Sequence, residues 1–413
     1  MSARNDSRLN VLMVGTEYTT GFVHDGASGS DKRIGVVGLV LFDMRRRGKV
    51  DKLAMVGTTG RKNAAVREHL RTNIAGVYKD MDVSVDMLPA DSVDRAPDAY
   101  KAAIDAMSPG DAVTIFTPDD THFEIALHAI RRGLHVLIAK PAVQTLEHHQ
   151  TLVREADKHG VLVVVEFHKR FDPIYSDARE RIRRLGDFGF FTSYMSQPKA
   201  QLHTFRSWAG KSSDISFYLN SHHIDLHAWS LQNVARPVRV TATASTGVAT
   251  REPYNCVPGT EDTITLLVQW KNLASGNLGT AVYTASWVAP KAEVHSQQRF
   301  FYMGHGGEIR VDQAHRGYET ATDESGYASV NPLFMRYTPD PLGYYAGQQA
   351  YGHRSIEAWA EACLAIKRGE AVAADFEGRL PTIRETAIVT AVLEAGRKSL
   401  SLGGAPVDID ESI

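Results

Sequence analysis

The residue best placed to do chemistry in this sequence is Lys140, which directly follows the short apolar segment 135–139. A second apolar segment, 112–116, lies upstream and is stopped by a turn at 117–120. Between the two segments, the spacing of apolar residues predicts a helix over 122–132. Two strands joined by a crossover helix form a right-handed parallel unit, whose strand ends open toward bound ligand. Lys140 is therefore expected at the ligand-facing edge of a parallel sheet.

A second group of reactive side chains lies near the middle of the chain. Tyr218 and His222 are one turn apart on a predicted helix and share a face, with Asp225 one step further along. These three residues form a plausible acid/base array. The adjacent His222 and His223 point about a quarter-turn apart on a helix, so they cannot converge easily on one ion. No metal site is expected.

Several segments around these residues resemble the Gfo/Idh/MocA oxidoreductases, named for glucose-fructose oxidoreductase and inositol dehydrogenase. The string Thr-Pro-Asp-Asp-Thr-His-Phe-Glu-Ile-Ala at 117–126 and the string Gly-Leu-His-Val-Leu-Ile-Ala-Lys-Pro at 133–141 carry the resemblance. The usual family motif is Glu-Lys-Pro, so Ala139 replaces the acid. Three later segments resemble the strand leaving the nucleotide domain, the active-site helix and the closing helix of the family: 166–173, 220–226 and 385–400. Motifs in the family's order are more specific than any one alone.

This resemblance implies the activity and the roles of the central residues. The family acts mainly on sugars, cyclitols and related polyols with NAD or NADP, and Lys140 and His222 match its lysine and histidine. Oxidation of a secondary alcohol by hydride transfer removes a hydroxyl proton, which an imidazole with a pKa of about 6.5 can accept. We expect His222 to be the base and Lys140 to polarise the substrate oxygen. Tyr218 stands where the family often has Asp, and is expected to donate a hydrogen bond or share in proton transfer.

Other readings of the same residues stay open. The family also contains NAD-using glycoside hydrolases and sensors that bind nucleotide without turnover. An intact lysine and histidine argue against a sensor. Without the resemblance, Lys140 could belong to an ordinary salt bridge and His222 could be a capped helix histidine.

The expected fold is a Rossmann-like α/β nucleotide-binding domain over 1–167, followed by a C-terminal α+β domain over 168–413 with an open, mostly antiparallel sheet. The second region has strand-like segments separated by turns, which favours that layout. Two helices and one long ordered loop, at 330–352, are also predicted there. The predicted strands and helices are 188–196, 238–243, 263–270, 280–288, 300–303, 356–366 and 381–400.

The cofactor site is expected where the first strand, 9–14, ends at Gly15 and Thr16. The usual glycine spacing then fails, because a polar and glycine-rich insertion ending at 27–33 separates this strand from a helix predicted over 34–47. Its small residues could let backbone amides approach a pyrophosphate. The alternative is a surface loop.

The second strand, predicted over 52–56, is followed by Thr58, Thr59, Arg61 and Lys62 and by no acid. Two hydroxyls and two bases suit the 2′-phosphate of NADP, so these residues favour NADP over NAD. Alternatively, Arg61 and Lys62 begin a solvated helix.

Additional contacts are expected around this central site. By family resemblance, Thr117, Pro118 and His122 would line the nicotinamide side. Lys169 and Arg170 follow a strand predicted over 161–167 and could hold substrate oxygens or cofactor, unless they form a solvated domain junction. Trp208 could stack on an apolar sugar face or be a core residue. Together with Asp225, these are the candidate substrate-binding residues.

Bulk properties narrow the class of partner. The chain has 413 residues and a formal net charge of −2, which favours neither nucleic acid nor an anionic membrane. Its longest apolar run, 34–42, is far too short for a membrane span, and the polar start lacks the core of a signal peptide. With only Cys256 and Cys363 present, we expect a cytoplasmic protein with a small-molecule substrate. By family resemblance, it would be a homo-oligomer, either a dimer or a tetramer.

Overall fold

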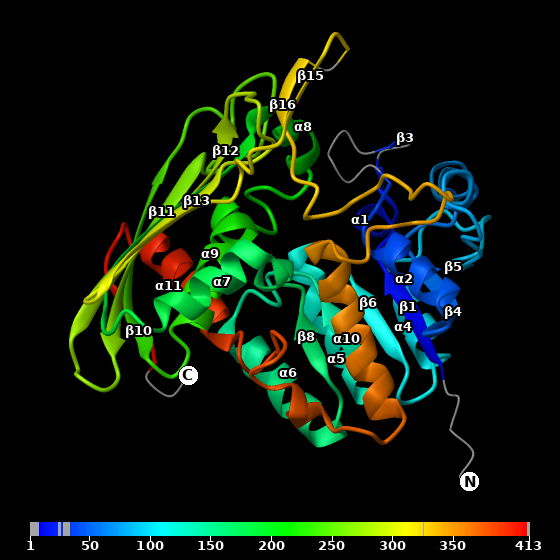
Figure 1. Ribbon diagram of the computed structural model, residues 1–413, viewed down its shortest axis with the longest axis horizontal. Coiled ribbons are helices and arrows are strands. Elements are labelled where there is room, and N and C mark those ends of the chain that lie inside the picture. Colours follow the sequence, from blue (N-terminus) through cyan, green and yellow to red (C-terminus); the bar gives the residue numbers. More distant parts are fainter. Residues whose placement is uncertain (1–7, 24–25, 28–33, 325, 411–413) are drawn as a thin grey trace.

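The N-terminal part of the chain forms a parallel sheet of six strands (Figure 1). The structure, a computed structural model, describes residues 8–23, 26–27, 34–324 and 326–410. The strand order is β5-β4-β1-β6-β7-β8, the order of a doubly wound nucleotide-binding fold. The strands are short, and the central ones are buried on both faces, which explains their continuous apolar sequences. Their bounds are β1 Leu9–Val14, β4 Val50–Val56, β5 Asp86–Leu88, β6 Ala112–Ile115, β7 His135–Ile138 and β8 Val163–Val165.

Helices on both sides of this sheet complete the nucleotide domain, and two of them match the sequence closely. The predicted helix over 122–132 is α5, and the Thr145 side chain caps α6 by accepting from His148 N at 3.3 Å. The main helices are α2 Val37–Arg46, α3 Asn63–Leu70, α4 Ala99–Asp105, α5 His122–Arg131 and α6 Leu146–His159. Short helical turns also occur: η1 Arg71–Ala75 and η2 Asp119–Thr121.

The insertion after β1 contains a small folded unit. It begins with the helical turn α1 Glu17–Thr20, followed by the paired strands β2 Phe22–Val23 and β3 Gly26–Ala27. The next helix starts at Val37 rather than at residue 34, because Gly35 has a φ of +79° and cannot continue a right-handed helix. A Cβ at Gly35 would lie 2.5 Å from Thr19 O, so only glycine fits there. The predicted end of the insertion, 28–33, lies outside the described residues.

The C-terminal part forms a second, seven-stranded sheet in the order β14-β13-β9-β12-β11-β10-β17. All pairings are antiparallel except that of β9 with β12. Helices α7, α9 and α11 lie between this sheet and the nucleotide domain (Figure 1). The five predicted strands are present, and β14 and β17 were not foreseen. The bounds are β9 Phe188–Pro198, β10 Ala235–Ser245, β11 Thr263–Asn272, β12 Leu278–Ala289, β13 Gln298–Gly304, β14 Gly307–Asp312, β17 Val407–Asp408, α7 Pro173–Ile182, α9 Ser221–Ser230 and α11 Ala387–Ser401.

Smaller elements connect these layers. A hairpin extends beyond the second sheet, and several helical turns carry side chains of the site. They are η3 His168–Phe171, η4 Lys199–Gln201, α8 Leu202–Phe205, η5 Ser216–Asn220, β15 Glu319–Thr322, β16 Gly326–Ser329 and η6 Ala373–Phe376.

After the second sheet, the chain returns to the nucleotide domain (Figure 1). The long loop predicted over 330–352 is present up to Ala350, and its Tyr337 carbonyl accepts a hydrogen bond from Tyr78 Oη at 2.6 Å. Helix α10, Tyr351–Lys367, then packs into the core of that domain with Trp359 fully buried. The predicted boundary at 167 did not include this return.

One predicted helix begins later than its sequence pattern suggests. The pattern favoured a helix from residue 381, whereas α11 starts at Ala387. The reason is that the preceding backbone pairs beside β8: Val165 N donates to Pro381 O, and Ile383 N donates to Val163 O, both at 2.9 Å.

Candidate active site

The turns after β1 and β6 meet where the strand order of the parallel sheet reverses. Gly15, which ends β1, has a φ of +97°, and a Cβ there would lie only 2.2 Å from Phe116 O. The same Cβ would lie 3.2 Å from Thr117 Cγ2. Doubly wound folds bind dinucleotides in the crevice at this switch point. A turn that only glycine can form, next to Thr16 and Thr117, fits a dinucleotide.

The loop after β4 lies beside this turn and carries the predicted adenosine contacts. Thr58 is exposed, and Thr59 Oγ1 accepts from Arg61 N at 3.3 Å. The Arg61 guanidinium forms an ion pair with Asp94, whose side chain is 64% exposed. No acidic residue follows β4 directly in the sequence. The fold instead places Asp94, which is 33 residues after Arg61, beside the arginine. Asp94 therefore competes with a 2′-phosphate for Arg61.

Lys140 follows β7 and is held by Tyr218 through two contacts. Its Nζ donates to the Tyr218 carbonyl and lies 4.1 Å from the centre of the Tyr218 ring. Tyr218 belongs to the π-helical turn η5, and such turns occur frequently at functional sites. The ring attracts the ammonium through its electron-rich face. The structure thus brings Lys140 and Tyr218 together through the ring and carbonyl of the tyrosine.

His222 lies one turn beyond Tyr218, at the start of α9, and is 5% exposed. Its Nδ1 is buried without a hydrogen-bond partner. Burial lowers the pKa of His222 well below its ordinary value, and the charges of Lys140 and Lys169 lower it further. The imidazole is therefore neutral at neutral pH, and the same shift makes it a weaker base than an ordinary histidine.

Trp208 lies against Tyr218 in a group of four aromatic side chains. Its ring centre is 5.5 Å from that of Tyr218 and 5.8 Å from that of Trp287, and Phe205 completes the group. Trp208 is half-buried, so part of its surface stays exposed next to the residue that holds Lys140. This position is compatible with stacking on a substrate.

Lys169 and Arg170, which lie after β8, have different surroundings. Lys169, 4% exposed, donates from Nζ to Gln298 at the start of β13. Arg170 forms a buried two-pronged ion pair with Asp225, at 2.7 and 3.0 Å, and also contacts Glu385 at 3.0 Å. Arg170 and Asp225 thus bind each other, and this geometry favours a role in joining η3 to α9 over direct contact with substrate.

Removal of the arginine from this buried cluster should strongly destabilise the protein. We expect Arg170→Ala to lower the free energy of unfolding by about 3–5 kcal/mol, because Asp225 and Glu385 would be left buried without their cation. Denaturant unfolding followed by circular dichroism measures this change.

An exposed arginine next in sequence to Glu385 is the matched control. Arg384 pairs with Asp157, and the two side chains are 54% and 60% exposed. Arg384→Ala should change the free energy of unfolding by no more than about 1 kcal/mol. Equal losses in the two variants would contradict the assignment of Arg170 as a buried structural cation.

The motif after β6 contains the predicted residues Thr117, Pro118 and His122 and one residue that was not predicted. His122 is fully buried, and its ring nitrogens lie 2.9 Å from Pro141 O and from Thr117 O. It therefore ties the turn after β6 to the turn after β7 and positions Thr117 and Pro118 rather than facing a ligand. Asp119 was missed: Ser213 Oγ donates to its carboxylate at 2.5 Å. Burial raises the pKa of Asp119, and the charge of Lys140 opposes that rise.

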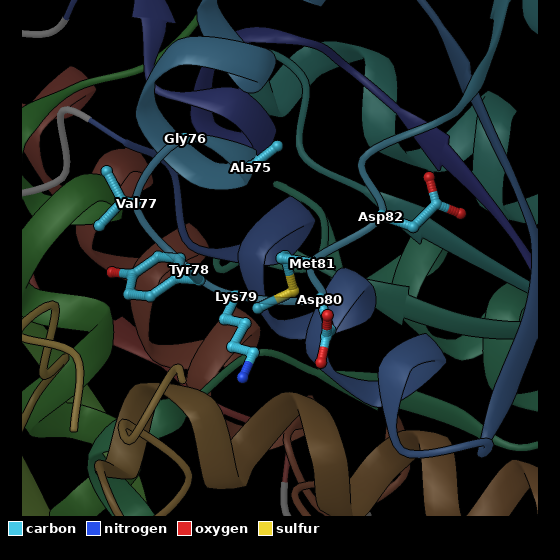
Figure 2. Close-up of a pocket in the computed structure, with 8 residues that line it drawn as sticks. All are labelled: Ala75, Gly76, Val77, Tyr78, Lys79, Asp80, Met81 and Asp82. Atoms are coloured by element: carbon cyan, nitrogen blue, oxygen red, sulfur yellow. The ribbon is translucent and has the colours of Figure 1, made fainter. Parts of the chain in front are cut away.

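A separate hollow lies on the nucleotide domain, away from these residues. It has a volume of about 500 Å³ and is formed by the consecutive residues 75–82. Figure 2 shows that the polar ends of Tyr78, Lys79 and Asp82 point in different directions. Binding sites usually have polar groups that converge on the ligand, so this hollow is a poor candidate for the active site.

Comparisons with known proteins agree with this geometry. The family model described as "Oxidoreductase family, NAD-binding Rossmann fold" matches residues 32–167, the segment that includes Lys140 and the turn after β6. This nucleotide-binding segment belongs to the Gfo/Idh/MocA oxidoreductase family. The predicted fold class, a Rossmann-like domain with an open and mostly antiparallel second sheet, is confirmed.

Individual relatives act on cyclitols. A scyllo-inositol 2-dehydrogenase (NADP(+)) of Bacillus subtilis is 28% identical over 55% of this chain and 60% of its own length. Inositol 2-dehydrogenase 2 of Saccharopolyspora erythraea is 32% identical over 39% of this chain and 45% of its own. The chain thus matches about half the length of these curated relatives. The structure of scyllo-inositol dehydrogenase from Lactobacillus casei with NAD(H) and scyllo-inositol has a TM-score of 0.65 at 15% identity, covering 97% of this chain and 99% of that one.

The described part of the chain lacks the features of two other kinds of site. None of its helices combines the length and the apolar character that a membrane crossing requires. Within the same residues, no three His, Cys, Asp or Glu side chains are grouped as metal ligands.

Proposed function

We propose that this protein is an NAD(P)-dependent dehydrogenase that oxidises a secondary alcohol of a cyclitol such as inositol, or of a related polyol or sugar. The observation that carries this proposal is the assembly of Lys140, Tyr218 and His222 at the strand edge that also carries the Gly15 turn. The relatives named for inositol oxidation support the substrate class.

Each residue of this assembly has a distinct role in the proposal. Bound nicotinamide supplies the hydride acceptor, held by Gly15, Thr16, Thr117 and Pro118. His222 removes the proton of the substrate hydroxyl, because its neutral imidazole has a lone pair to offer. The Lys140 ammonium stabilises the negative charge that develops on the substrate oxygen. Tyr218 keeps the ammonium in place through its ring and carbonyl.

Lys169 and Trp208 complete the proposed substrate site. Trp208 offers an aromatic face next to Tyr218, and Lys169 adds positive charge near His222. The aromatic face of Trp208 suits the C–H groups of a polyol, and the Lys169 cation suits its hydroxyls.

A panel of scyllo-inositol, myo-inositol and simple sugars, each with NAD⁺ or NADP⁺, tests this function by the absorbance of reduced nicotinamide. Net reduction with a cyclitol is the expected result. Glycoside cleavage with cofactor that stays bound would instead show a redox-assisted hydrolase. Cofactor binding without any turnover would show a sensor.

For the cofactor, we propose NADP, with Arg61 exchanging Asp94 for the 2′-phosphate. Exposed ion pairs are weak, so a phosphate dianion can displace a carboxylate from Arg61. We expect Arg61→Ala to reduce the preference for NADP⁺ over NAD⁺ by about tenfold in kcat/KM, and Asp94→Asn to increase it. Unchanged ratios in both variants would refute the role of Arg61.

For the assembly, we propose a homo-oligomer, a dimer or tetramer, formed through the outer face of the second sheet. Leu266 packs against Gly396 of α11, so its neighbour Leu267 faces away from the helices and is 48% exposed. Met303 on β13 is likewise 42% exposed. Leu267→Asp should dissociate the oligomer in light scattering, whereas Leu342→Asp, on the loop before α10, should not. A monomeric wild-type protein would contradict this proposal.

For the cellular location, we propose the cytoplasm. Both cysteines, Cys256 and Cys363, are buried free thiols. Free thiols persist most readily in a reducing compartment.

A further inference from the structure

A second imidazole lies beside His222 and has no role in the proposed mechanism so far. His168, in the turn η3 after β8, is 8% exposed, and its ring centre lies 5.4 Å from that of His222 in an edge-to-face arrangement. The Tyr351 ring stacks on the His168 ring, with their centres 5.8 Å apart, and the centre of the Phe334 ring lies 5.2 Å from that of His168. The ring is therefore fixed in place at the inner side of His222.

A buried carboxylate orients this imidazole. Glu166, 6% exposed, lies 2.8 Å from His168 Nδ1 through Oε2, while its Oε1 accepts from Ser355 Oγ at 2.9 Å. A carboxylate accepts hydrogen bonds, so His168 Nδ1 carries the proton and Nε2 holds the lone pair in the neutral ring. The same carboxylate stabilises the imidazolium when Nε2 takes up a second proton.

His222 has no comparable partner. Its Nδ1 is buried without a hydrogen bond, and the positive charges of Lys140 and Lys169 act on its ring. A proton that His222 removes from a substrate is therefore poorly stabilised there and needs an acceptor. His168 is the neighbouring imidazole, within reach directly or through one water.

We propose that Glu166 and His168 form a positioning pair that receives the substrate proton from His222. The substrate O–H bond breaks as an N–H bond forms on His222, and that bond breaks as an N–H bond forms on His168. The hydride of the same carbon goes to the oxidised nicotinamide, and His168 returns the proton to water. The substrate thus loses two electrons and two hydrogens. This inference rests on the proposed dehydrogenase function.

Glu166→Gln and His168→Gln test the pair with scyllo-inositol and NADP⁺. We expect kcat to fall about 10- to 100-fold in each variant, with KM for scyllo-inositol within about twofold of wild type. The titratable groups facing His168 are Glu166, His222 and Tyr351; those facing His222 are Lys140, Lys169, His168 and His223. Loss of the Glu166 charge should move the acidic limb of the kcat profile about one unit lower.

Histidine-selective ¹⁵N NMR of the protein without cofactor gives a second readout, independent of turnover. The signals that disappear in His168→Gln belong to His168. In the wild-type protein these signals should show a protonated Nδ1, and their chemical shifts should change in Glu166→Gln. His149→Gln is the matched control, because His149 is also a buried histidine. Its partners are Thr390 and the Ile383 carbonyl, which lie outside the proposed site, so this substitution should leave kcat unchanged.

The outcomes separate this inference from the function on which it rests. If wild type oxidises no cyclitol, polyol or sugar, the proposed function fails, and the NMR still decides whether the Glu166–His168 pair exists. If wild type is active and both variants keep its kcat and pH profile, the pair plays no part in proton transfer. If His168→Gln does not fold, the isosteric Glu166→Gln carries the test.

Discussion

Lys140→Ala should lose nearly all turnover and still bind cofactor. Lys140 is the cation that stabilises charge developing on the substrate oxygen, and loss of one such donor typically lowers kcat by about 10²–10³-fold, roughly 3–4 kcal/mol of transition-state stabilisation. Cofactor affinity should stay within about threefold, because the Gly15 turn and the loop after β4 are untouched. Steady-state kinetics with scyllo-inositol and quenching of tryptophan fluorescence by NADP⁺ measure the two quantities.

A lysine elsewhere on the same sheet is the control. Lys52 on β4 is exposed, so Lys52→Ala should retain wild-type kcat. Unchanged activity in Lys140→Ala would refute the proposed mechanism. Loss of cofactor binding together with activity would instead move Lys140 into the cofactor site.

Acid should unfold this protein well before its carboxylates are neutralised. Burial lowers the pKa of His135 and His149 to about 4 and that of His223 to about 3, and it lowers the pKa of His222 and His227 well below the ordinary value. Below pH 6.5 the unfolded chain therefore binds protons that the folded chain does not. The free energy of unfolding then decreases as the pH decreases. At pH 5 each of His135, His149 and His223 costs roughly 2 kcal/mol, so these three alone remove a large part of the stability of a typical domain.

Thermal unfolding between pH 7.5 and 4.5 checks this expectation. The unfolding midpoint should fall steeply below pH 6.5. In His149→Gln it should fall less steeply, because unfolding of this variant takes up about one proton fewer. His305→Gln removes an exposed histidine and should leave the dependence as in wild type. A midpoint that is constant down to pH 5 would show that the buried imidazoles take up protons in the folded state.

Local patterns in the sequence predicted most of the fold because burial and periodicity are local properties. The helix predicted over 122–132 matched α5, His122–Arg131, to within one residue. What local patterns could not predict was long-range pairing. The backbone at Pro381 adopts an extended form because it pairs beside β8, and Trp359 is buried in a domain that began 350 residues earlier.

The candidate site shows the same division. Strand ends and helix spacing predicted a site with Lys140, Tyr218 and His222, and the structure brings Lys140 and Tyr218 into contact. Charge partners were missed, because Asp94 reaches Arg61 from a separate segment. Glu166 and His168 stand two residues apart after a strand. That local spacing is compatible with a carboxylate–imidazole pair, which was not predicted.

Deuterium transfer tests the central claim most directly. Scyllo-inositol carrying deuterium on its ring carbons would be incubated with the wild-type protein and NADP⁺ or NAD⁺, and the reduced cofactor analysed by mass spectrometry. We expect one deuterium per reduced nicotinamide, and in Lys140→Ala the labelled cofactor should form about 10²–10³-fold more slowly. Reduced cofactor without deuterium, or cyclitol turnover that leaves the nicotinamide oxidised, would contradict hydride transfer from the alcohol carbon.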